Sequence, residues 1–335
     1  MAATIIDVAR RAGVAVTTVS RVMNNKGQVA VATRDRVLAA IKDLEYRPSP
    51  AARGLPRRRL HAISIVVPFV THPSSVARVQ GMVQGFRDTD LPVSILDVEK
   101  PEDQDKHFDM LASSLRPEGA VIVSLHPSGS QLTSFQQAGI YPVFVDARVN
   151  GFSSVFIDDR RGGTLATRHL LALGHRNIAF VGDRTDTQFG FTSSVRRHQG
   201  YRDSLLAAGI EPNPAYERLG EHGRAPSRTL ALALFALSQP PTAVFAASDT
   251  QAIGVLDAAR EAGLRVPEDL SVIGFDDIEV SEYLGISTVR HPLHASGSIA
   301  AELVIEHIRH PGLSPKSVEQ AVEVIARATT GPPPD

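Results

Sequence analysis

The hydrophobic pattern of the first 50 residues predicts three short helices. Thr4, with Asp7 three residues later, reads as a capping box that opens the first helix. Gly13 then permits the tight turn that ends this helix. Apolar residues at helical spacing form one stripe between these two signals: Ile5, Val8, Ala9 and Ala12. The stripe predicts a helix that packs through one face.

A second helix follows the turn almost at once. Its apolar residues Val19, Val22 and Met23 can face the first helix. A third helix, at about 33–44, offers its own apolar positions to the same small core. The pattern therefore predicts a helix-turn-helix with one supporting helix. The open side of the second helix carries Val16, Thr17, Thr18, Ser20, Arg21 and Asn24.

From His61 onward the pattern changes to short apolar runs that alternate with helical stretches. Continuous Val- and Ile-rich runs of this kind are typical of buried parallel strands. Two successive alternations predict two doubly wound α/β lobes with parallel sheets. The expected strands span residues 62–67, 93–96, 119–124, 142–146, 177–182, 243–248 and 271–275. The expected helices lie near residues 78–86, 104–115, 132–138, 162–173, 199–208 and 251–262.

Polar side chains stand where many of these strands end. Ligands of doubly wound sheets bind at the carboxyl ends of the strands. Carboxylates and hydroxyls there suit a polyhydroxylated ligand, because a carboxylate accepts hydrogen bonds from neighbouring hydroxyls. Each aspartate could instead cap the helix or turn that follows, and the sequence leaves both interpretations open. The residues concerned are Phe69, Ser124, Asp146, Asp183, Ser248, Asp249, Asp276 and Asp277.

The first 60 residues, called the head below, differ in net charge from the rest of the chain. Residues 1–60 hold twelve Lys/Arg and four Asp/Glu, a net charge of +8, whereas the remainder holds 23 basic and 32 acidic residues, a net of −9. The open face of the second helix has no carboxylate, and Arg21 could read guanine in a major groove. The alternative is an ordinary solvated helix face. Taken with the turn, the charge favours DNA binding.

The segment after Tyr46 is predicted to form a helix only when other contacts support it. Ser49 can cap it and Pro50 suits its first position, but residues 49–55 are too few to be stable alone in water. Leu55 lies in a basic setting that includes Arg53, which suits insertion between minor-groove base steps. The alternative is a Pro-rich, charged linker.

Composition bounds the remaining possibilities. The 335 residues include no cysteine, so disulfides and thiolate metal sites are excluded. No signal sequence and no apolar run near the roughly 18 residues of a membrane span are present, so we expect a soluble, cytoplasmic protein. Neither a G-x-S-x-G elbow, a phosphate loop, a G-x-G-x-x-G after the first strand nor an H-E-x-x-H cluster occurs. We therefore expect no catalytic residue, no cofactor and no metal.

Three sequence motifs carry a resemblance to a known family. They are DVA-x-x-AGV, then TVSRV-x-N, then TR-x-x-V-x-x-AI-x-x-L-x-Y-x-P. Through them, residues 4–55 resemble the headpiece and hinge helix of the LacI/GalR family of bacterial transcription regulators, and the similarity continues to Thr330. The resemblance implies a periplasmic-binding-protein-like core behind the headpiece.

The resemblance also implies roles for individual head residues. Val16, Thr17 and Arg21 match base-reading positions, and Gln28 is a further candidate reader. Ala15 and Ala30 depart from the family pattern, since each stands where a Ser helix cap is usual; each loss could cost about 1 kcal/mol. The phosphate-contacting positions and the minor-groove lever are matched by Thr18, Ser20, Asn24, Thr33 and Leu55.

In the core, the resemblance narrows the effector site. Arg197, before the Gly-Tyr pair, matches the family's ligand-clamping arginine, and Asp276 matches the effector-binding aspartate of the opposite wall. Ser74 and Ser75 replace a common aromatic pair, and Phe189 and Phe191 are expected to provide apolar contact instead. The full candidate site comprises Phe69, Ser74, Ser124, Asp146, Phe191, Arg197, Ser248, Asp276 and His291.

The sequence as a whole predicts a homodimeric regulator, favoured as a repressor, that binds a pseudo-palindromic operator and a small effector, with a sugar or sugar derivative favoured over a nucleobase. No leucine heptad follows Thr330, so a dimer is expected rather than a tetramer. The alternatives are a stand-alone sugar- or nucleobase-binding receptor and a sugar-modifying enzyme. The expected parts are a DNA-binding domain (1–47), a hinge and linker (48–60), a first lobe (61–158 and 291–320), a second lobe (159–290 and 321–330) and a tail (331–335).

Overall fold

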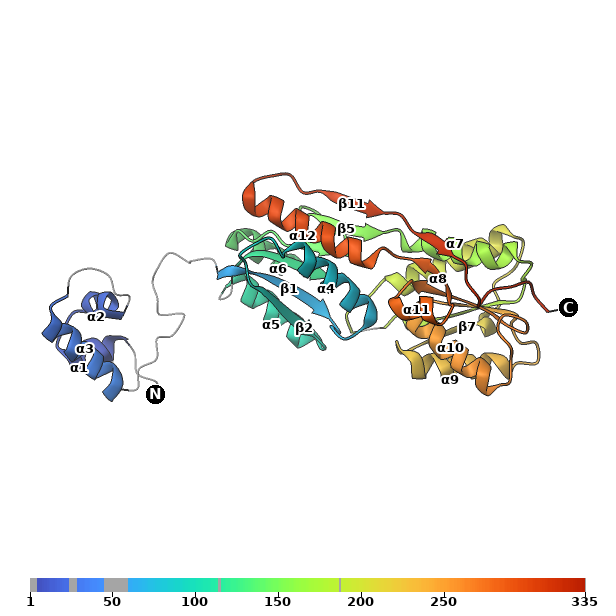
Figure 1. The fold of residues 1–335 in the computed structure, drawn as a ribbon, viewed down its shortest axis with the longest axis horizontal. Coiled ribbons are helices and arrows are strands. Elements are labelled where there is room, and N and C mark those ends of the chain that lie inside the picture. The colour runs from blue at the N-terminus through green and yellow to red at the C-terminus, as the bar shows by residue number, and fades with distance from the viewer. Residues whose placement is uncertain (1–4, 24–28, 45–59, 114–115, 187, 335) are drawn as a thin grey trace. The chain divides into compact units, whose positions relative to one another are not determined.

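The computed structural model describes residues 5–23, 29–44, 60–113, 116–186 and 188–334. It divides the chain into two compact units, residues 1–59 and residues 60–335. The first unit contains the predicted helical head, and the second contains both α/β lobes (Figure 1). Each unit is described by itself.

The head is built from three helices around a small apolar core. Val8, Val19 and Val37 are fully buried in this core, one from each helix. Arg11 of the first helix also pairs with Asp43 of the third, at 3.0 Å between Nη2 and Oδ2. The helix-turn-helix and its support form as the apolar pattern predicts. The helices are α1 (Ile5–Ala12), α2 (Val16–Met23) and α3 (Val31–Asp43).

The first lobe contains a six-stranded sheet in the order β11-β5-β4-β3-β1-β2, and all its strand pairs are parallel. Its central strands are continuously buried because helices cover both faces. Five strands come from the segment before the second lobe, and β11 returns from near the C-terminal end. The strands are β1 (Leu60–Pro68), β2 (Val93–Val98), β3 (Pro117–Val123), β4 (Val143–Val145), β5 (Ser154–Ile157) and β11 (Ser317–Gln320).

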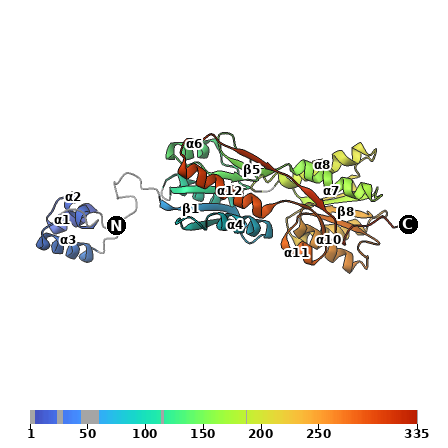
Figure 2. The same ribbon diagram turned by 45° about the horizontal axis from the view of Figure 1, so that its top comes forward.

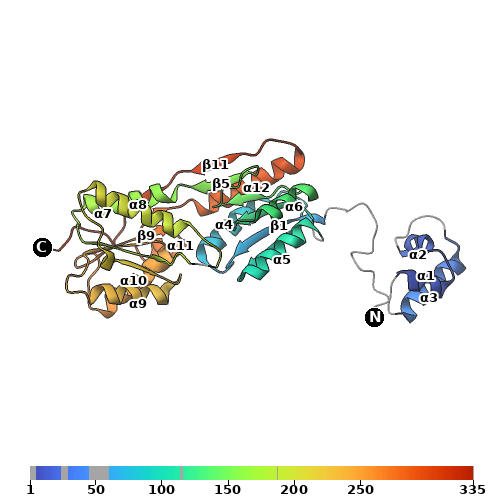
Figure 3. The ribbon, with the colours of Figure 1, turned by 180° about the vertical axis from the view of Figure 1, so that it is seen from behind.

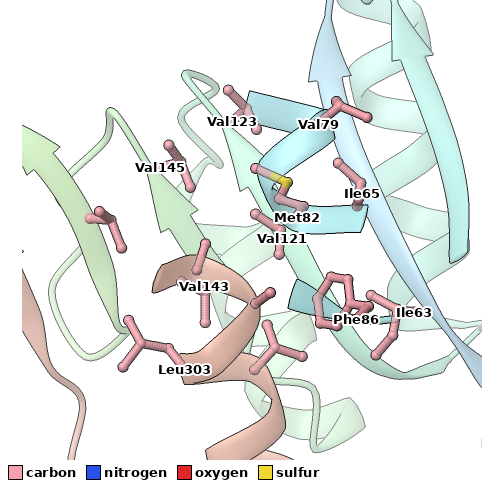
Figure 4. Packing of buried hydrophobic residues seen from close by; sticks show 14 of the residues in the cluster. Ile63, Ile65, Val79, Met82, Phe86, Val121, Val123, Val143, Val145 and Leu303 are labelled. Carbon is pink, nitrogen blue, oxygen red and sulfur yellow. The ribbon is translucent and has the colours of Figure 1, made fainter. Parts of the chain in front are cut away.

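Helices α4 and α12 cover one face of this sheet, and α5 and α6 cover the other. Figure 4 shows Met82 of α4 and Phe86, which follows α4, in one apolar cluster with Ile63 of β1, Val121 of β3 and Leu303 of α12. The contact between α4 and α12 joins segments more than 200 residues apart in the sequence. The helices are α4 (Pro73–Gly85), α5 (Pro101–Ala112), α6 (Gly129–Ala138) and α12 (Leu293–Arg309).

The second lobe repeats this plan. Its sheet has the order β12-β10-β9-β8-β6-β7, and every pair is parallel except β10 with β12. Strand for strand, β6 to β10 occupy the places of β1 to β5, and β12 takes the place of β11. The strands are β6 (Ile178–Asp183), β7 (Glu217–Gly220), β8 (Ala243–Ala246), β9 (Ser271–Asp276), β10 (Ser287–Arg290) and β12 (Glu323–Ile325).

Helices α7 and α8 cover one face of the second sheet, and α9 and α10 cover the other (Figure 3). By the strand correspondence, α8 follows the first strand of this lobe as α4 follows that of the first lobe. The helical segments are α7 (Asp159–Ala172), α8 (Ser193–Ala207), η2 (Pro214–Tyr216), α9 (Arg224–Phe235), α10 (Asp249–Glu261) and α11 (Glu279–Tyr283).

The chain passes between the two lobes three times, from β5 to α7, from β10 to α12 and from β11 to β12. Figure 2 shows β5 and α12 of the first lobe running toward the second. The carboxyl ends of both sets of parallel strands therefore meet where the lobes join.

The element boundaries differ from the expected ones in a regular way. Helices α4, α5 and α6 begin three to five residues earlier than the apolar pattern indicated, at Pro73, Pro101 and Gly129, because polar or proline residues form their first turns. The pattern also missed α9, the short helix α11 and the short strands β5, β7, β10, β11 and β12. Residues 114–115, at the expected end of α5, lie outside the described residues.

Candidate functional site

The candidate DNA-binding face lies on α2. Val16, Thr17 and Arg21 are exposed, whereas Val19 and Val22 are buried against the other two helices. Thr18, Ser20 and Thr33 are partly exposed. Asn24, Gln28, Arg53, Leu55 and the expected hinge helix lie outside the described residues. The structure thus presents the described candidates on an open helix face that carries no carboxylate.

A cluster of buried charges lies where the two lobes meet, and Arg197 of α8 is its centre in the second lobe. The guanidinium donates from Nε to Asp159, at 2.8 Å, and from Nη1 to the carbonyl oxygen of Ala247, at 2.6 Å. Its Nη1 also lies 3.7 Å from Asp276. The group stacks on the Phe275 ring, 3.6 Å from the centroid. These contacts fix the guanidinium from several directions.

Arg78 of α4 has the corresponding place in the first lobe, and the sequence did not predict it. It pairs with Asp146, and its Nη2 lies 3.4 Å from Nδ1 of His291. Ser124 contributes a weak contact, with its hydroxyl 3.4 Å from Asp146. The first-lobe side of the cluster therefore brings together three residues that the sequence predicted, Ser124, Asp146 and His291, and one that it missed, Arg78.

The two arginine–aspartate pairs are related by the repeated fold. Arg78 and Arg197 each lie in the second turn of the helix that follows the first strand of a lobe. Asp146 directly follows the fourth strand of the first lobe, and Asp276 ends the fourth strand of the second. His291, on the crossover after β10, lies between them, with Nε2 3.5 Å from Asp146 and Nδ1 4.0 Å from Asp276. Both lobes thus present the same charged pair to one site.

The backbone at this edge is held in an unusual conformation. Phe69, Ser124, Asp146, Asp276 and Asp277 all have positive φ, between 47° and 110°, although none is glycine. Such conformations cost free energy and cluster at ligand sites. All five follow or end a strand and were candidates from strand ends alone. Arg116 is the one other non-glycine residue of the described chain with positive φ.

Burial controls the protonation of the cluster. It raises the pKa of Asp146, an effect that Arg78 opposes, and it raises the pKa of Asp276, opposed by Arg197. Burial, with the neighbouring charges of Arg78 and Arg197, lowers the pKa of His291 well below its ordinary value. His291 is therefore a neutral hydrogen-bonding group at neutral pH.

Aromatic rings from both lobes form a second cluster. Phe69 stacks on His72 at 4.9 Å and meets Phe189 of the second lobe edge-on at 5.7 Å, measured between ring centroids. Phe189 contacts Phe191, and both rings pack on the apolar core of the first lobe. His72 also lies 5.3 Å from His222, whose Nδ1 is 3.1 Å from Asp183. In the structure both rings contact the first lobe, and their apolar contact with an effector stays a prediction.

Other candidates have local structural partners. Ser248 is the N-cap of α10 and accepts from the backbone of Gln251. Ser74 offers its carbonyl oxygen to Arg78, at 3.0 Å. Asp249 accepts hydrogen bonds within its own lobe, from Ile278, Ser281 and Thr288. Ser248 rather than Asp249 therefore caps α10, and the carboxylate of Asp249 holds the segment from Ile278 to Thr288 instead.

Away from the cluster, the described residues of the second lobe form a groove of about 650 Å³ on the outer face of α10 and α11. Its wall is largely apolar and includes Ile253, Leu256, Val280 and Leu284. Among the described residues no group of acidic and histidine side chains could hold a metal, and no helix is long and apolar enough to cross a membrane.

Comparison with known proteins agrees with this architecture. Residues 4–49 match the family model described as bacterial regulatory proteins of the lacI family, and residues 167–330 match a periplasmic binding protein-like domain. The transcriptional repressor PurR of Haemophilus influenzae (strain PittEE) is 31% identical over 314 residues, which covers 92% of both chains. The chain belongs to the LacI family.

Further relatives extend over the whole length of this LacI-family protein. Catabolite control protein A of Priestia megaterium is 28% identical over 98% of this chain and 100% of its own. Among solved structures, the transcriptional regulator CelR in complex with cellobiose has a TM-score of 0.71, with 29% identity over 98% of this chain and 99% of that one. A LacI-family regulator from Silicibacter pomeroyi has a TM-score of 0.73, with 26% identity over 98% and 99%.

These relatives confirm the predicted class. The protein is a DNA-binding transcription regulator with a ligand-binding core, and the predictions of a receptor without DNA function and of a sugar-modifying enzyme are set aside. The predicted fold, a helix-turn-helix head with two doubly wound lobes, is also confirmed.

Proposed function

We propose that this LacI-family regulator is a cytoplasmic repressor that binds a polyhydroxylated small molecule, a sugar or sugar derivative, between its lobes. Binding changes its affinity for a pseudo-palindromic operator. The observation that carries the proposal is the convergence of Arg78–Asp146 and Arg197–Asp276 from opposite lobes. Guanidinium and carboxylate groups together can donate to and accept from neighbouring hydroxyls. The cellobiose complex of CelR, a relative along the whole chain, supports a sugar.

In this proposal Arg197 and Asp276 hold the ligand from the second lobe, while Asp146, Ser124 and His291 hold it from the other side. Because one ligand contacts both lobes, it stabilises the lobe arrangement in which both sets of contacts form. A ligand shifts such an equilibrium only by its differential affinity for the two states. Phe69, Phe191, Ser74 and Ser248 complete the proposed effector site.

The parts of the chain follow from this division of labour. We assign DNA reading to residues 1–47 and coupling to the hinge and linker at 48–60. The first lobe is residues 61–158 and 291–320, the second is 159–290 and 321–330, and a tail of 331–335 follows. The chain crossings after β5, after β10 and after β11 support the lobe limits.

We also propose that the working unit is a homodimer. One head reads too few base pairs for specificity in a genome, so two heads on a two-fold symmetric operator are needed. The groove on α10 and α11, with the exposed side chains of Val280, Tyr283 and Leu284, is the candidate dimer face.

The test measures operator affinity with and without candidate sugars for the parent protein and for Arg197→Ala. The variant should bind operator normally and lose the response to the sugar, because it removes the central donor of the cluster. The control is Arg228→Ala, which removes an exposed arginine paired with Glu261 on the outer surface. A sugar response that survives in Arg197→Ala would contradict the proposed site.

A further inference from the structure

The guanidinium of Arg78 is only partly satisfied, although it is buried. Its residue is 6% exposed, and Nη1 donates to the carbonyl oxygen of Ser74. Nη2 contacts Asp146 and His291. Among the described residues, the buried Nε has no hydrogen-bond partner. Nε and Nη2 form the edge through which arginine binds a carboxylate with two parallel hydrogen bonds. Half of that edge is therefore unused.

Asp146 does not fill this edge. It contacts Nη2 through Oδ2 alone, while its buried Oδ1 makes no hydrogen bond and lies 3.5 Å from Nε2 of His291. The pair is thus a single contact rather than a forked one. A carboxylate placed against Nε and Nη2 would make the contact that Asp146 leaves incomplete.

The two arginines also differ in their charge balance. Arg197 is paired with two carboxylates, Asp159 and Asp276. Arg78 is paired with one carboxylate among the described residues, Asp146. An anionic group that enters the site is therefore less strongly repelled on the Arg78 side. If Asp146 turns toward a ligand hydroxyl, the charge of Arg78 is left for the anion to neutralise.

We propose that the effector is a sugar acid whose carboxylate binds the Nε–Nη2 edge of Arg78, while its hydroxyls are held by Arg197 and Asp276. This inference rests on the proposed function and names the chemical class of the ligand. Burial already raises the pKa of Asp146, and a nearby anion acts on this pKa in the same direction, so we expect proton uptake to accompany binding of the acid. Arg78 is then the residue that distinguishes an acid from the corresponding neutral sugar.

The experiment uses matched acid and neutral probes: D-glucuronate with D-glucose, D-galacturonate with D-galactose, and D-gluconate with D-glucitol. Their binding to the full-length protein is measured by calorimetry. For at least one pair the parent should prefer the acid, and Arg78→Met should lower that preference roughly tenfold to one-hundredfold, the range expected for hydrogen bonds to a charged group. Repeating the acid titration in buffers of different ionisation enthalpy should reveal proton uptake by the parent.

Two further variants keep the result interpretable. Arg228→Met removes an exposed, ion-paired arginine and should leave the preference unchanged. Arg78→Met combined with Asp146→Asn removes both charges, so loss of preference there is not caused by an unpaired buried aspartate. Tighter binding of the neutral probes, or an acid preference that survives in Arg78→Met, would overturn this inference and leave the proposed function standing. Failure of every probe to bind the parent would overturn both.

Discussion

Two aspartates that follow neighbouring strands of the second lobe have very different partners. Asp276 ends β9 and faces Arg197, whereas Asp249 begins α10 and accepts from the hydroxyls of Ser281 and Thr288, at 2.7 and 2.6 Å. Burial raises the pKa of Asp249 to about 7. Asp276 therefore faces the site between the lobes, whereas Asp249 holds α10 to the segment that follows β9.

At the residue scale, Arg21 carries the sharpest prediction about DNA. It is exposed on α2, on the face without carboxylates. Arg21→Ala should weaken specific binding by roughly 1–3 kcal/mol and remove preference at one base pair in each half-site, as expected for a bidentate contact to guanine. A binding-site selection on randomised DNA measures this. An unchanged base preference would assign Arg21 to another role.

His291 predicts a pH dependence of stability. Its pKa is lowered in the folded protein, first by burial and then by Arg78 and Arg197. Below about pH 6.5, His291 binds a proton in the unfolded chain but not in the folded protein. The free energy of unfolding therefore falls as the pH falls. Relative to His291→Gln, the parent should lose up to about 1.4 kcal/mol per pH unit in that range.

Denaturant unfolding between pH 7 and pH 5 makes the measurement. His294→Gln is the matched control, because His294 is exposed one turn further along the chain. Equal pH slopes for the parent and His291→Gln would show that His291 is charged or solvated in the folded state.

The ends of the predicted strands identified much of the candidate site, whereas the residues that were missed are buried or partly buried charged side chains on helices. Asp146, Ser124 and Asp276 follow apolar runs and were therefore readable as candidates. Arg78 was not, because a charged residue within a helix usually faces water. The residue is 6% exposed and its partners, Asp146 and His291, are distant in the sequence. Asp159, the partner of Arg197, was missed for a similar reason, since it begins a helix and reads as an ordinary helix-opening acid.

At the element scale, glycines set how closely pairs of helices cross. A Cβ on Gly297 of α12 would overlap the carbonyl oxygen of Arg78 on α4, and a Cβ on Gly163 of α7 would overlap the carbonyl oxygen of Arg197 on α8. In both lobes, the helix that carries the arginine is therefore backed by a crossing helix at backbone contact. This packing fixes the depth at which each guanidinium enters the site.

Gly297→Ala should therefore destabilise the protein by about 1–3 kcal/mol, the usual cost of overpacking. The contrast is Gly129→Ala at the start of α6, where a Cβ meets nothing within 4 Å, so alanine should be neutral or stabilise by up to about 1 kcal/mol. Unfolding free energies of both variants make the comparison. A harmless Gly297→Ala would mean that α4 and α12 can separate without cost.

Four of the strands that the sequence missed are too short to show a clear apolar pattern. Strands β7, β10, β11 and β12 are three or four residues long, and β7 (ERLG) and β11 (SVEQ) have no apolar run. Strands β7, β11 and β12 lie at the sheet edges, where backbone pairing rather than side-chain burial selects them. Strand β10 is buried next to an edge, but its Ser and Thr residues break the apolar pattern. The buried central strands, by contrast, can be predicted from their continuous runs of Val and Ile.

At the scale of the whole molecule, the proposed dimer can be tested by a substitution on α11. Tyr283 is 81% exposed beside the apolar groove, so a charge there should oppose burial between two copies. Tyr283→Asp should shift the protein toward the 36.0 kDa monomer and weaken operator binding. Glu279→Asp on the same helix is the conservative control. Sedimentation at micromolar protein measures both, and a Tyr283→Asp protein that keeps its parental mass would move the interface elsewhere.

The late return of α12 and β11 to the first lobe has a consequence for biosynthesis. At about 5–20 residues per second, a ribosome needs on the order of 10–40 s to translate from the end of α4 to the start of α12. During that interval the apolar residues of α4 and β1 that α12 later covers remain uncovered. The three helices of the DNA-reading head, which end by Asp43, are finished long before. Each newly made regulator therefore acquires the part that recognises DNA first and the part that senses the effector last.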